Sequence, residues 1–289
     1  MTQPTFPGMP TPLYVASPSR LLAWLDCPRR YRMHYLDRPR PRPRGQRAHT
    51  SVGIATHNVL RDFWDLPPER RNPAGVAELV RTSWIDVGFR DGDQSRAWRD
   101  RVRERVTDYL RGIDRERHPV GVERSVSVKT ATLAVTGRVD RLDERGDAVV
   151  VVDYKTGRRV PTPDDARTSL PLALYAVAAG SVLRRPCTRV ELHHVPSGTV
   201  VGHEHTGESL ARKVAEAESI AADLRRADAD FREHGPDSDR FPARPSALCG
   251  WCDYRDHCPE GRQVGPAQAD WAGLEPLPGP ATGTAAGPS

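Results

Sequence analysis

Residues 137–157, GRVDRLDERGDAVVVVDYKTG, decide how the fold of this 289-residue chain is interpreted. Four consecutive valines, residues 149–152, form an apolar run that is typical of a strand buried on both faces of a sheet. The β-branched segments at residues 122–128, 132–142 and 148–154 are bounded by turn residues, which predicts three strands. The middle of the chain is therefore expected to form a sheet that contains one strand buried on both faces.

Two acidic residues and a lysine lie on the predicted strands. Side chains alternate along a strand, so Asp153 and Lys155 point to one face and Tyr154 to the other. If residues 145–146 form the hairpin tip, Asp140 lies across from Val151 and diagonal to Asp153. That diagonal is about 7–8 Å, close enough for both carboxylates to hold one divalent cation. A register slip of one residue would turn Asp140 to the opposite face.

Carboxylate oxygens with open positions suit Mg²⁺ or Mn²⁺, which can carry a water that attacks phosphorus. Lys155 would orient or deprotonate this water and stabilise the charge that develops on a phosphate. An Asp-x-Lys triplet also arises by chance, so the prediction depends on its context: a buried strand before it and Asp140 on the preceding strand.

Helical periodicity surrounds this sheet on both sides. We expect a helix after Ser17, a plausible N-cap followed by Pro18. Further helices are expected over residues 52–65, 74–87, 94–114, 168–180 and 208–232, with strands at residues 188–195 and 199–205. The Pro-rich and Gly-rich ends predict disordered tails at residues 1–16 and 261–289 around one domain at residues 17–260.

Four cysteines suggest a metal centre that joins the two ends of the chain. Cys249, Cys252 and Cys258 form C-x₂-C-x₅-C, and Cys27 stands alone near the N-terminus. Four thiolates can hold zinc or a four-iron, four-sulfur cluster, and spacing alone does not choose between them. The Cys-Pro pairs at residues 27–28 and 258–259 favour iron. Cys187 has no partner at ligand spacing and is interpreted as an ordinary thiol.

Composition and the basic segments give weaker indications of a nucleic-acid partner. A net charge of +5 is mild evidence for a polyanion. Arg29, Arg30 and Arg32 alternate with Tyr31 and Tyr35, and residues 38–47, RPRPRPRGQR, predict an extended basic strap. Arginine beside aromatic rings suits single-stranded DNA, although a coding bias toward arginine would give the same surface.

Several classes of protein are excluded or not expected. No apolar run is long enough for a membrane span, and no secretory signal is evident, so a soluble cytoplasmic protein is expected. The chain lacks a G-x-x-x-x-G-K-[ST] loop, so any ATP-driven helicase would be a separate partner.

These motifs resemble the PD-(D/E)XK nuclease superfamily, and most closely its RecB-type exonucleases that carry an iron-sulfur cluster. The resemblance implies an α/β core, a central mixed sheet flanked by helices, with a helical insertion and a Cys-rich C-terminal segment. It implies DNA, single-stranded or with free ends, as the substrate. Residues 53–57, GIATH, match the family's G-x-x-x-H, which implies that His57 is a further metal ligand.

The resemblance also assigns roles to other residues. It implies that Asp140, Asp153 and the carbonyl of Tyr154 bind metal, that Lys155 assists catalysis, and that Glu123 is the acid preceding the metal strands. Tyr175 fits the tyrosine of the family's Gln-x-x-x-Tyr helix, but Pro171 occupies the glutamine position and removes a polar group. For the cysteines it implies a 4Fe-4S cluster held by Cys27, Cys249, Cys252 and Cys258, with zinc as the alternative.

The sequence thus predicts a metal-dependent DNA exonuclease acting in repair or recombination. Because of Pro171, a second interpretation stays open: a nucleic-acid-binding module that keeps the nuclease fold and a structural four-cysteine centre without full activity. A zinc protein acting as a scaffold for a repair complex is a third.

Overall fold

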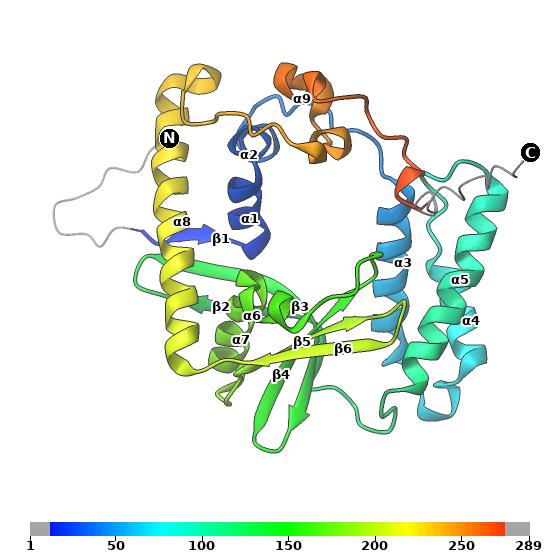
Figure 1. Ribbon diagram of the computed structural model, residues 1–289. Coiled ribbons are helices and arrows are strands. Elements are labelled where there is room, and N and C mark those ends of the chain that lie inside the picture. Colours follow the sequence, from blue (N-terminus) through cyan, green and yellow to red (C-terminus); the bar gives the residue numbers. More distant parts are fainter. Residues whose placement is uncertain (1–11, 275–289) are drawn as a thin grey trace, which may run out of the picture.

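A six-stranded mixed sheet forms the centre of the computed structural model, which describes residues 12–274 (Figure 1). The strand order is β1-β3-β4-β5-β6. β1 and β4 pair with successive stretches of one edge of β3, and β2 pairs along the opposite edge. β1 and β3 are parallel, as are β4 and β5, whereas the remaining pairs are antiparallel. The strands are β1 (Tyr14–Ala16), β2 (Gly121–Lys129), β3 (Leu133–Arg145), β4 (Ala148–Lys155), β5 (Arg189–His194) and β6 (Thr199–Glu204).

The hairpin between β3 and β4 has a different register from the one predicted. Arg145 pairs with Ala148, so the two-residue turn consists of Gly146 and Asp147, and Val151 lies opposite Leu142 rather than Asp140. Gly146 has a φ of 64°, which glycine adopts readily and which two-residue hairpin turns require. The turn therefore sits one residue further along the chain than expected. The shift moves each partner by two positions, so every side chain keeps its face.

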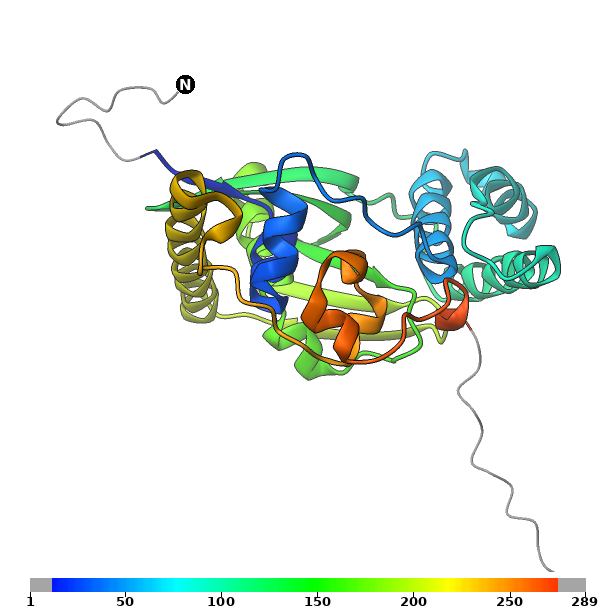
Figure 2. The same ribbon diagram turned by 90° about the horizontal axis from the view of Figure 1, so that it is seen from above.

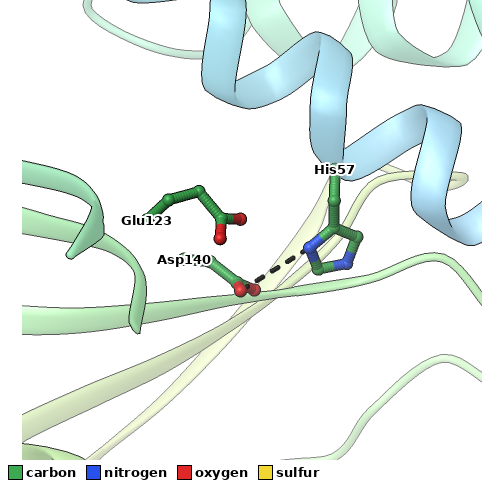
Figure 3. Close-up of side chains that lie close together, drawn as sticks. All are labelled: His57, Glu123 and Asp140. Atoms are coloured by element: carbon green, nitrogen blue, oxygen red, sulfur yellow. Dashed lines mark ion pairs between the residues drawn. The ribbon is translucent and has the colours of Figure 1, made fainter. Parts of the chain in front are cut away.

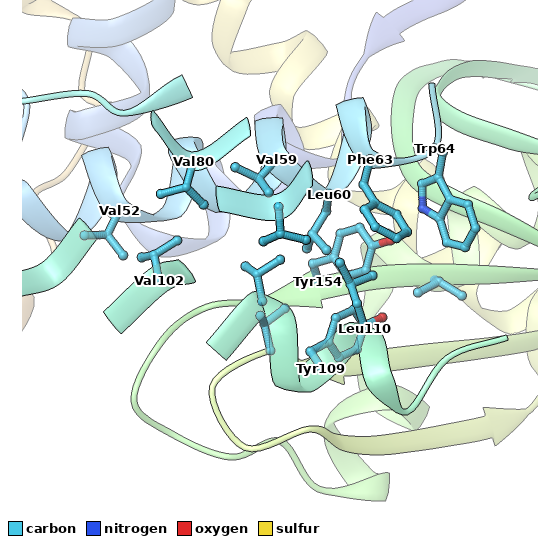
Figure 4. Close-up of a cluster of buried hydrophobic side chains, with 14 of the residues drawn as sticks. Val52, Val59, Leu60, Phe63, Trp64, Val80, Val102, Tyr109, Leu110 and Tyr154 are labelled. Atoms are coloured by element: carbon cyan, nitrogen blue, oxygen red, sulfur yellow. The ribbon is translucent and has the colours of Figure 1, made fainter. Parts of the chain in front are cut away.

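The four valines of β4 confirm the prediction of a strand buried on both faces. Val149 and Val151 pack in a cluster with α7 (Leu170–Leu183). Val150 and Val152 join a second cluster that contains residues of α3 (Ala48–Phe63) and α5 (Gly92–Arg111), shown in Figure 4. Helices on both sides of β4 therefore fix its position within the sheet.

The helices form two groups that rise from the sheet on opposite sides (Figures 1 and 2). The helices α1, α2 and α8 stand on one side, and α3, α4 and α5 on the other. A C-terminal segment that includes α9 runs between the two groups, away from the sheet. The remaining α-helices are α1 (Pro18–Asp26), α2 (Pro28–Tyr35), α4 (Pro73–Ser83), α6 (Pro163–Thr168), α8 (Gly207–His234) and α9 (Pro259–Gln263).

The first helix begins where the sequence predicts. The Ser17 side chain accepts a hydrogen bond from the Arg20 backbone N–H at 3.2 Å, and Pro18 opens α1. The capping serine and the proline thus give a defined N-terminus. Three short helices, α2, α6 and α9, were not predicted, because eight, six and five residues are too few to show clear periodicity.

The predicted tails need correction where the structure describes them. Residues 14–16 form β1, which runs parallel to the start of β3. At the other end, Leu274 is buried and joins the cluster of α3 and α5. Both segments are ordered because they add to a sheet edge or to the core. Residues 1–11 and 275–289, also predicted as tails, lie outside the described residues.

The basic strap is extended, as predicted, and it lies along the C-terminal segment. The Arg44 backbone N–H donates to the Asp253 carbonyl at 2.9 Å, and Arg47 forms an ion pair with the Asp253 carboxylate at 2.8 Å. Arg40 donates to the Tyr254 hydroxyl at 3.0 Å. Three arginines of the strap therefore form hydrogen bonds or ion pairs within the chain.

The buried position of Tyr31 corrects one part of the DNA-binding prediction. Tyr31 is 0% exposed and packs against Trp24, so its ring is not available to stack on a base. Its hydroxyl donates to Asp228 at 2.9 Å, which fixes α2 to α8.

Among the described helices, none is long and apolar enough to cross a membrane.

Candidate active site

His57, Glu123 and Asp140 converge from three different elements (Figure 3). His57 lies on α3, Glu123 on β2 and Asp140 on β3. One ligand atom from each side chain lies within 4.8 Å of the other two, and His57 Nδ1 is 3.5 Å from Asp140 Oδ1. An imidazole and two carboxylates at this spacing match the donors that a divalent cation takes.

The position of His57 depends on α3 approaching the end of β4. Gly53, one turn earlier, lies so close that an added Cβ would be 3.4 Å from the Thr156 hydroxyl. Burial alone would lower the pKa of His57, but hydrogen bonding with Asp140 and the nearby Asp153 and Glu123 charges outweigh burial and raise the pKa. The carboxylates therefore favour a cation at this point.

The hairpin register brings Asp140 and Asp153 together. Arg141 pairs with Val152, so the next pair along the ladder is Asp140 with Asp153. Asp140 Oδ2 also accepts a hydrogen bond from the Tyr154 backbone N–H at 2.8 Å. The two acids are direct cross-strand neighbours, which is closer than the diagonal relation that was predicted.

Asp153 and Lys155 share one face, as alternation requires, and their charged groups lie 2.7 Å apart. Burial raises the pKa of Asp153, the ammonium of Lys155 opposes this, and the neighbouring Asp140 carboxylate adds to the rise. Tyr154 points to the opposite face, where its hydroxyl accepts a hydrogen bond from Arg141 at 3.1 Å. A partly buried acid paired with a half-exposed amine is the arrangement expected where a proton must be moved or held.

Glu123 has an unusual backbone conformation. Its φ is 47°, in the left-handed region that residues other than glycine seldom occupy. The flanking pairs Val122 with Arg141 and Arg124 with Val139 place it opposite Asp140. The strain aims the carboxylate at Asp140, and such strain is concentrated at functional sites.

Arg138 is a neighbour of this site that sequence reasoning missed. Its Nε lies 2.7 Å from Glu123 Oε2, while most of the arginine side chain is exposed. Arg138 is two residues before Asp140 on the same strand, so alternation along β3 was the signal that could have found it.

Tyr175 lies on α7, where its ring packs directly on Gly137 of β3. A Cβ on Gly137 would be 2.4 Å from Tyr175 Cε1. Burial raises the pKa of Tyr175, and the charges of Asp153 and Asp140 add to the rise, so the hydroxyl belongs to the same neighbourhood. Pro171 lies in the first turn of α7, where a proline is well tolerated.

Four of the five cysteines line one cavity of about 250 Å³: Cys27, Cys249, Cys252 and Cys258. The Cys249 and Cys258 sulfurs each accept a backbone N–H at 3.4 Å, from Ser246 and Gly261. Cys187 is buried in the α7 cluster instead, and burial raises its pKa to about 12. The structure therefore brings together the same four thiols that the sequence singled out.

Fold and sequence together define the class of protein, an α/β nuclease with a mixed sheet flanked by helices. The chain belongs to the PD-(D/E)XK nuclease superfamily, whose family model matches residues 15–259. Nucleases of this superfamily use divalent metal ions, and the His57, Glu123 and Asp140 group provides suitable ligands.

One similar solved structure is a candidate exonuclease from Eubacterium rectale. It has a TM-score of 0.51 and 10% sequence identity, and the match covers 84% of this chain and 88% of that chain. At this identity the similarity shows a shared fold. No curated protein matches the chain.

Proposed function

We propose that this nuclease is a metal-dependent DNA exonuclease of the RecB type that hydrolyses phosphodiester bonds. The observation that carries the proposal is the convergence of His57, Glu123 and Asp140 within 4.8 Å, beside the Asp153–Lys155 ion pair. A cation-binding group next to an acid and an amine suits hydrolysis of a phosphodiester better than acyl or hydride transfer.

His57, Asp140 and Asp153 would hold Mg²⁺ or Mn²⁺, with Glu123 and the carbonyl of Tyr154 as further oxygen ligands. A bound divalent ion supplies an activated water and neutralises the charge that builds on the phosphate. Asp153 is partly buried beside Lys155, and Asp140 accepts a backbone N–H, so both carboxylates are held in fixed positions before any cation arrives.

Lys155 would act on the attacking water. Its Nζ forms an ion pair with Asp153 Oδ2 at 2.7 Å, and an ammonium group carries three hydrogens that it can donate to a water or a phosphate oxygen. Tyr175 lies over Gly137 at the same site and would donate its hydroxyl to substrate. Arg138, which is mostly exposed, would meet the DNA backbone.

We further propose that the four clustered cysteines hold a 4Fe-4S cluster. All four thiols line one cavity of about 250 Å³, and four thiolates can hold either zinc or such a cluster. The Cys-Pro pairs at residues 27–28 and 258–259 support iron.

The nuclease proposal is tested with protein purified without air and incubated with end-labelled single-stranded and duplex DNA. With Mg²⁺ or Mn²⁺ we expect products that shorten from the ends, and none in a chelator. Asp140→Asn and Lys155→Ala should each reduce the rate about 100-fold or more. Asp147→Asn, in the exposed turn of the same hairpin, is the matched control and should cleave normally.

The same experiment tests the alternative of a binding module without activity, which Pro171 kept open. Tight DNA binding with no cleavage under either metal would favour the module. Cleavage that persists unchanged in both Asp140→Asn and Lys155→Ala would contradict the assigned site.

A further inference from the structure

A second pocket lies beside the candidate active site. It has a volume of about 620 Å³ and is lined by Trp98, Arg101 and Arg105 of α5, by Arg158 after β4, and by Trp251 of the C-terminal segment. This size falls in the range of pockets that hold small organic groups, about 300–1,000 Å³. Its lining combines positive charge with aromatic rings.

The arginines of this pocket have no acidic partner among the described residues. Arg101 and Arg105 place their guanidinium carbons 4.8 and 5.3 Å from the Trp98 ring. Arg103, on the same helix but outside this pocket, instead pairs with Asp100 at 3.5 Å. Two neighbouring guanidiniums without a carboxylate repel each other, and burial together with Arg101 lowers the pKa of Arg105. The pocket therefore favours an anion.

Trp251 supplies the second kind of contact. Its half-buried indole lines this pocket and also the cysteine cavity, and it meets His49 edge to face at 5.5 Å. A half-buried indole in a basic pocket is the platform on which an unstacked base can lie.

The pocket and the candidate active site approach each other at the end of β4. Thr156 and Gly157, which directly follow Lys155, form part of the pocket wall. A DNA strand with its scissile phosphate at Lys155 would pass the end of β4 to place another nucleotide in the pocket.

We propose that this pocket binds one nucleotide of the single-stranded DNA that the candidate active site cleaves. Its phosphate contacts Arg101, Arg105 and Arg158, and its base stacks on Trp251. Trp98 is a positioning residue that holds two of the guanidiniums. The inference rests on the proposed nuclease function and names how that site holds its substrate. Forked guanidiniums match phosphate oxygens, and stacking is independent of base identity.

The test is binding of a fluorescein-labelled oligo(dT) in buffer without divalent ions, followed by anisotropy at several salt concentrations. Arg101→Gln with Arg158→Gln should raise Kd about tenfold or more and lower the salt slope by about 1.4, about 0.7 for each lost phosphate contact. The control pair, Arg103→Gln with Arg159→Gln, removes the same charge at neighbouring positions and should change Kd less than about threefold.

The stacking contact is tested separately. Trp251→Ala should raise Kd about tenfold, whereas Trp251→Phe, which keeps a ring, should restore most of the affinity. Equal weakening by the test and control pairs, or equal affinity of Trp251→Ala and wild type, would overturn the proposal.

Because binding is measured without cleavage, the two proposals fail separately. A protein that binds oligo(dT) through these residues but never cleaves with metal would keep the pocket and lose the nuclease assignment. A protein that cleaves normally, with Kd and KM unaffected by the Arg101 and Arg158 substitutions, would lose only the pocket.

Discussion

Gly137 allows α7 to reach the sheet where the acidic residues lie. Its missing side chain leaves the space that the Tyr175 ring occupies, and the ring is held near Asp140 and Asp153 as a result. The glycine of the GRVD motif is therefore explained by packing against a specific tyrosine rather than by backbone flexibility.

Gly137→Ala should destabilise the protein by about 1–3 kcal/mol, because the new methyl group and the Tyr175 ring cannot occupy the same space. Urea unfolding measures the change. Gly45→Ala is the control, since an added Cβ there meets no atom within 4 Å, and it should change the free energy of unfolding by less than about 0.5 kcal/mol. Equal unfolding midpoints for the two variants would show that Tyr175 moves aside without cost.

At this scale the sequence predicted residue types and faces better than contacts. Alternation along the strands predicted that Asp153 and Lys155 share a face, which the structure has, whereas His57 was singled out by the family's G-x-x-x-H motif. Arg138 was missed because its partner, Glu123, is distant in sequence and reaches it through a left-handed backbone conformation. Such a conformation leaves no pattern in a single sequence.

The strands β3, β4 and β5 are held together at one end by charges as well as by valines. Glu191 on β5 is almost fully buried, and Arg145 of β3 and Arg189 of β5 lie 2.8 and 2.7 Å from its carboxylate. His193 adds a third contact at 3.1 Å. Burial would raise the pKa of Glu191, but His193 and the two arginines outweigh burial and lower the pKa to about 2.

This depressed pKa predicts how the stability of the sheet depends on pH. A carboxylate with a lowered folded-state pKa stabilises the protein above its unfolded pKa, about 4.3, and this contribution is lost as pH falls toward 2. Glu191→Gln should therefore cost on the order of 2 kcal/mol at pH 7, and the difference from wild type should shrink between pH 4.5 and 2.

Urea unfolding of wild type and Glu191→Gln across that pH range measures the effect. Glu208→Gln is the control, because Glu208 is exposed on α8 and pairs with the exposed Arg212 of the next turn. A Glu191→Gln difference that stays constant down to pH 2 would mean that the arginines do not stabilise the charged form.

Element positions followed from periodicity more reliably than register did. The helix expected over residues 94–114 and the strands around the valine run lie where they were predicted, because their apolar patterns are long. The hairpin register was wrong because it depends on which residues form the turn, and the Gly146 conformation decides this. The shift preserved the predicted faces only because it moved each partner by two positions.

The described part of the chain is arranged as a ring in which the region around α1 and α2 meets the C-terminal segment that includes α9, away from the sheet (Figure 1). Cys27 lies at the junction of α1 and α2, and the other three clustered cysteines lie in the C-terminal segment that runs between the two helix groups. The spacing of the cysteines predicted that the ends meet, but not that the strap and Trp251 would border the same region. Those contacts join segments more than 200 residues apart.

The proposed cluster at this junction would stabilise the ring by closing a loop of about 220 residues, and loop closure of this length restricts the unfolded chain by about 5 kcal/mol. Cys27→Ser should therefore remove the brown colour and the iron, and should lower Tm by about 10 °C. Cys187→Ala removes a buried thiol outside the cavity, so this control should keep the iron and the visible spectrum even if packing changes lower Tm slightly.

Limited proteolysis separates loss of the junction from general unfolding. In Cys27→Ser we expect early cuts in the strap and near residue 250, with the sheet intact. A Cys27→Ser protein that keeps full iron content and resists cutting there would show that the ends are held by the ion pairs of the strap instead.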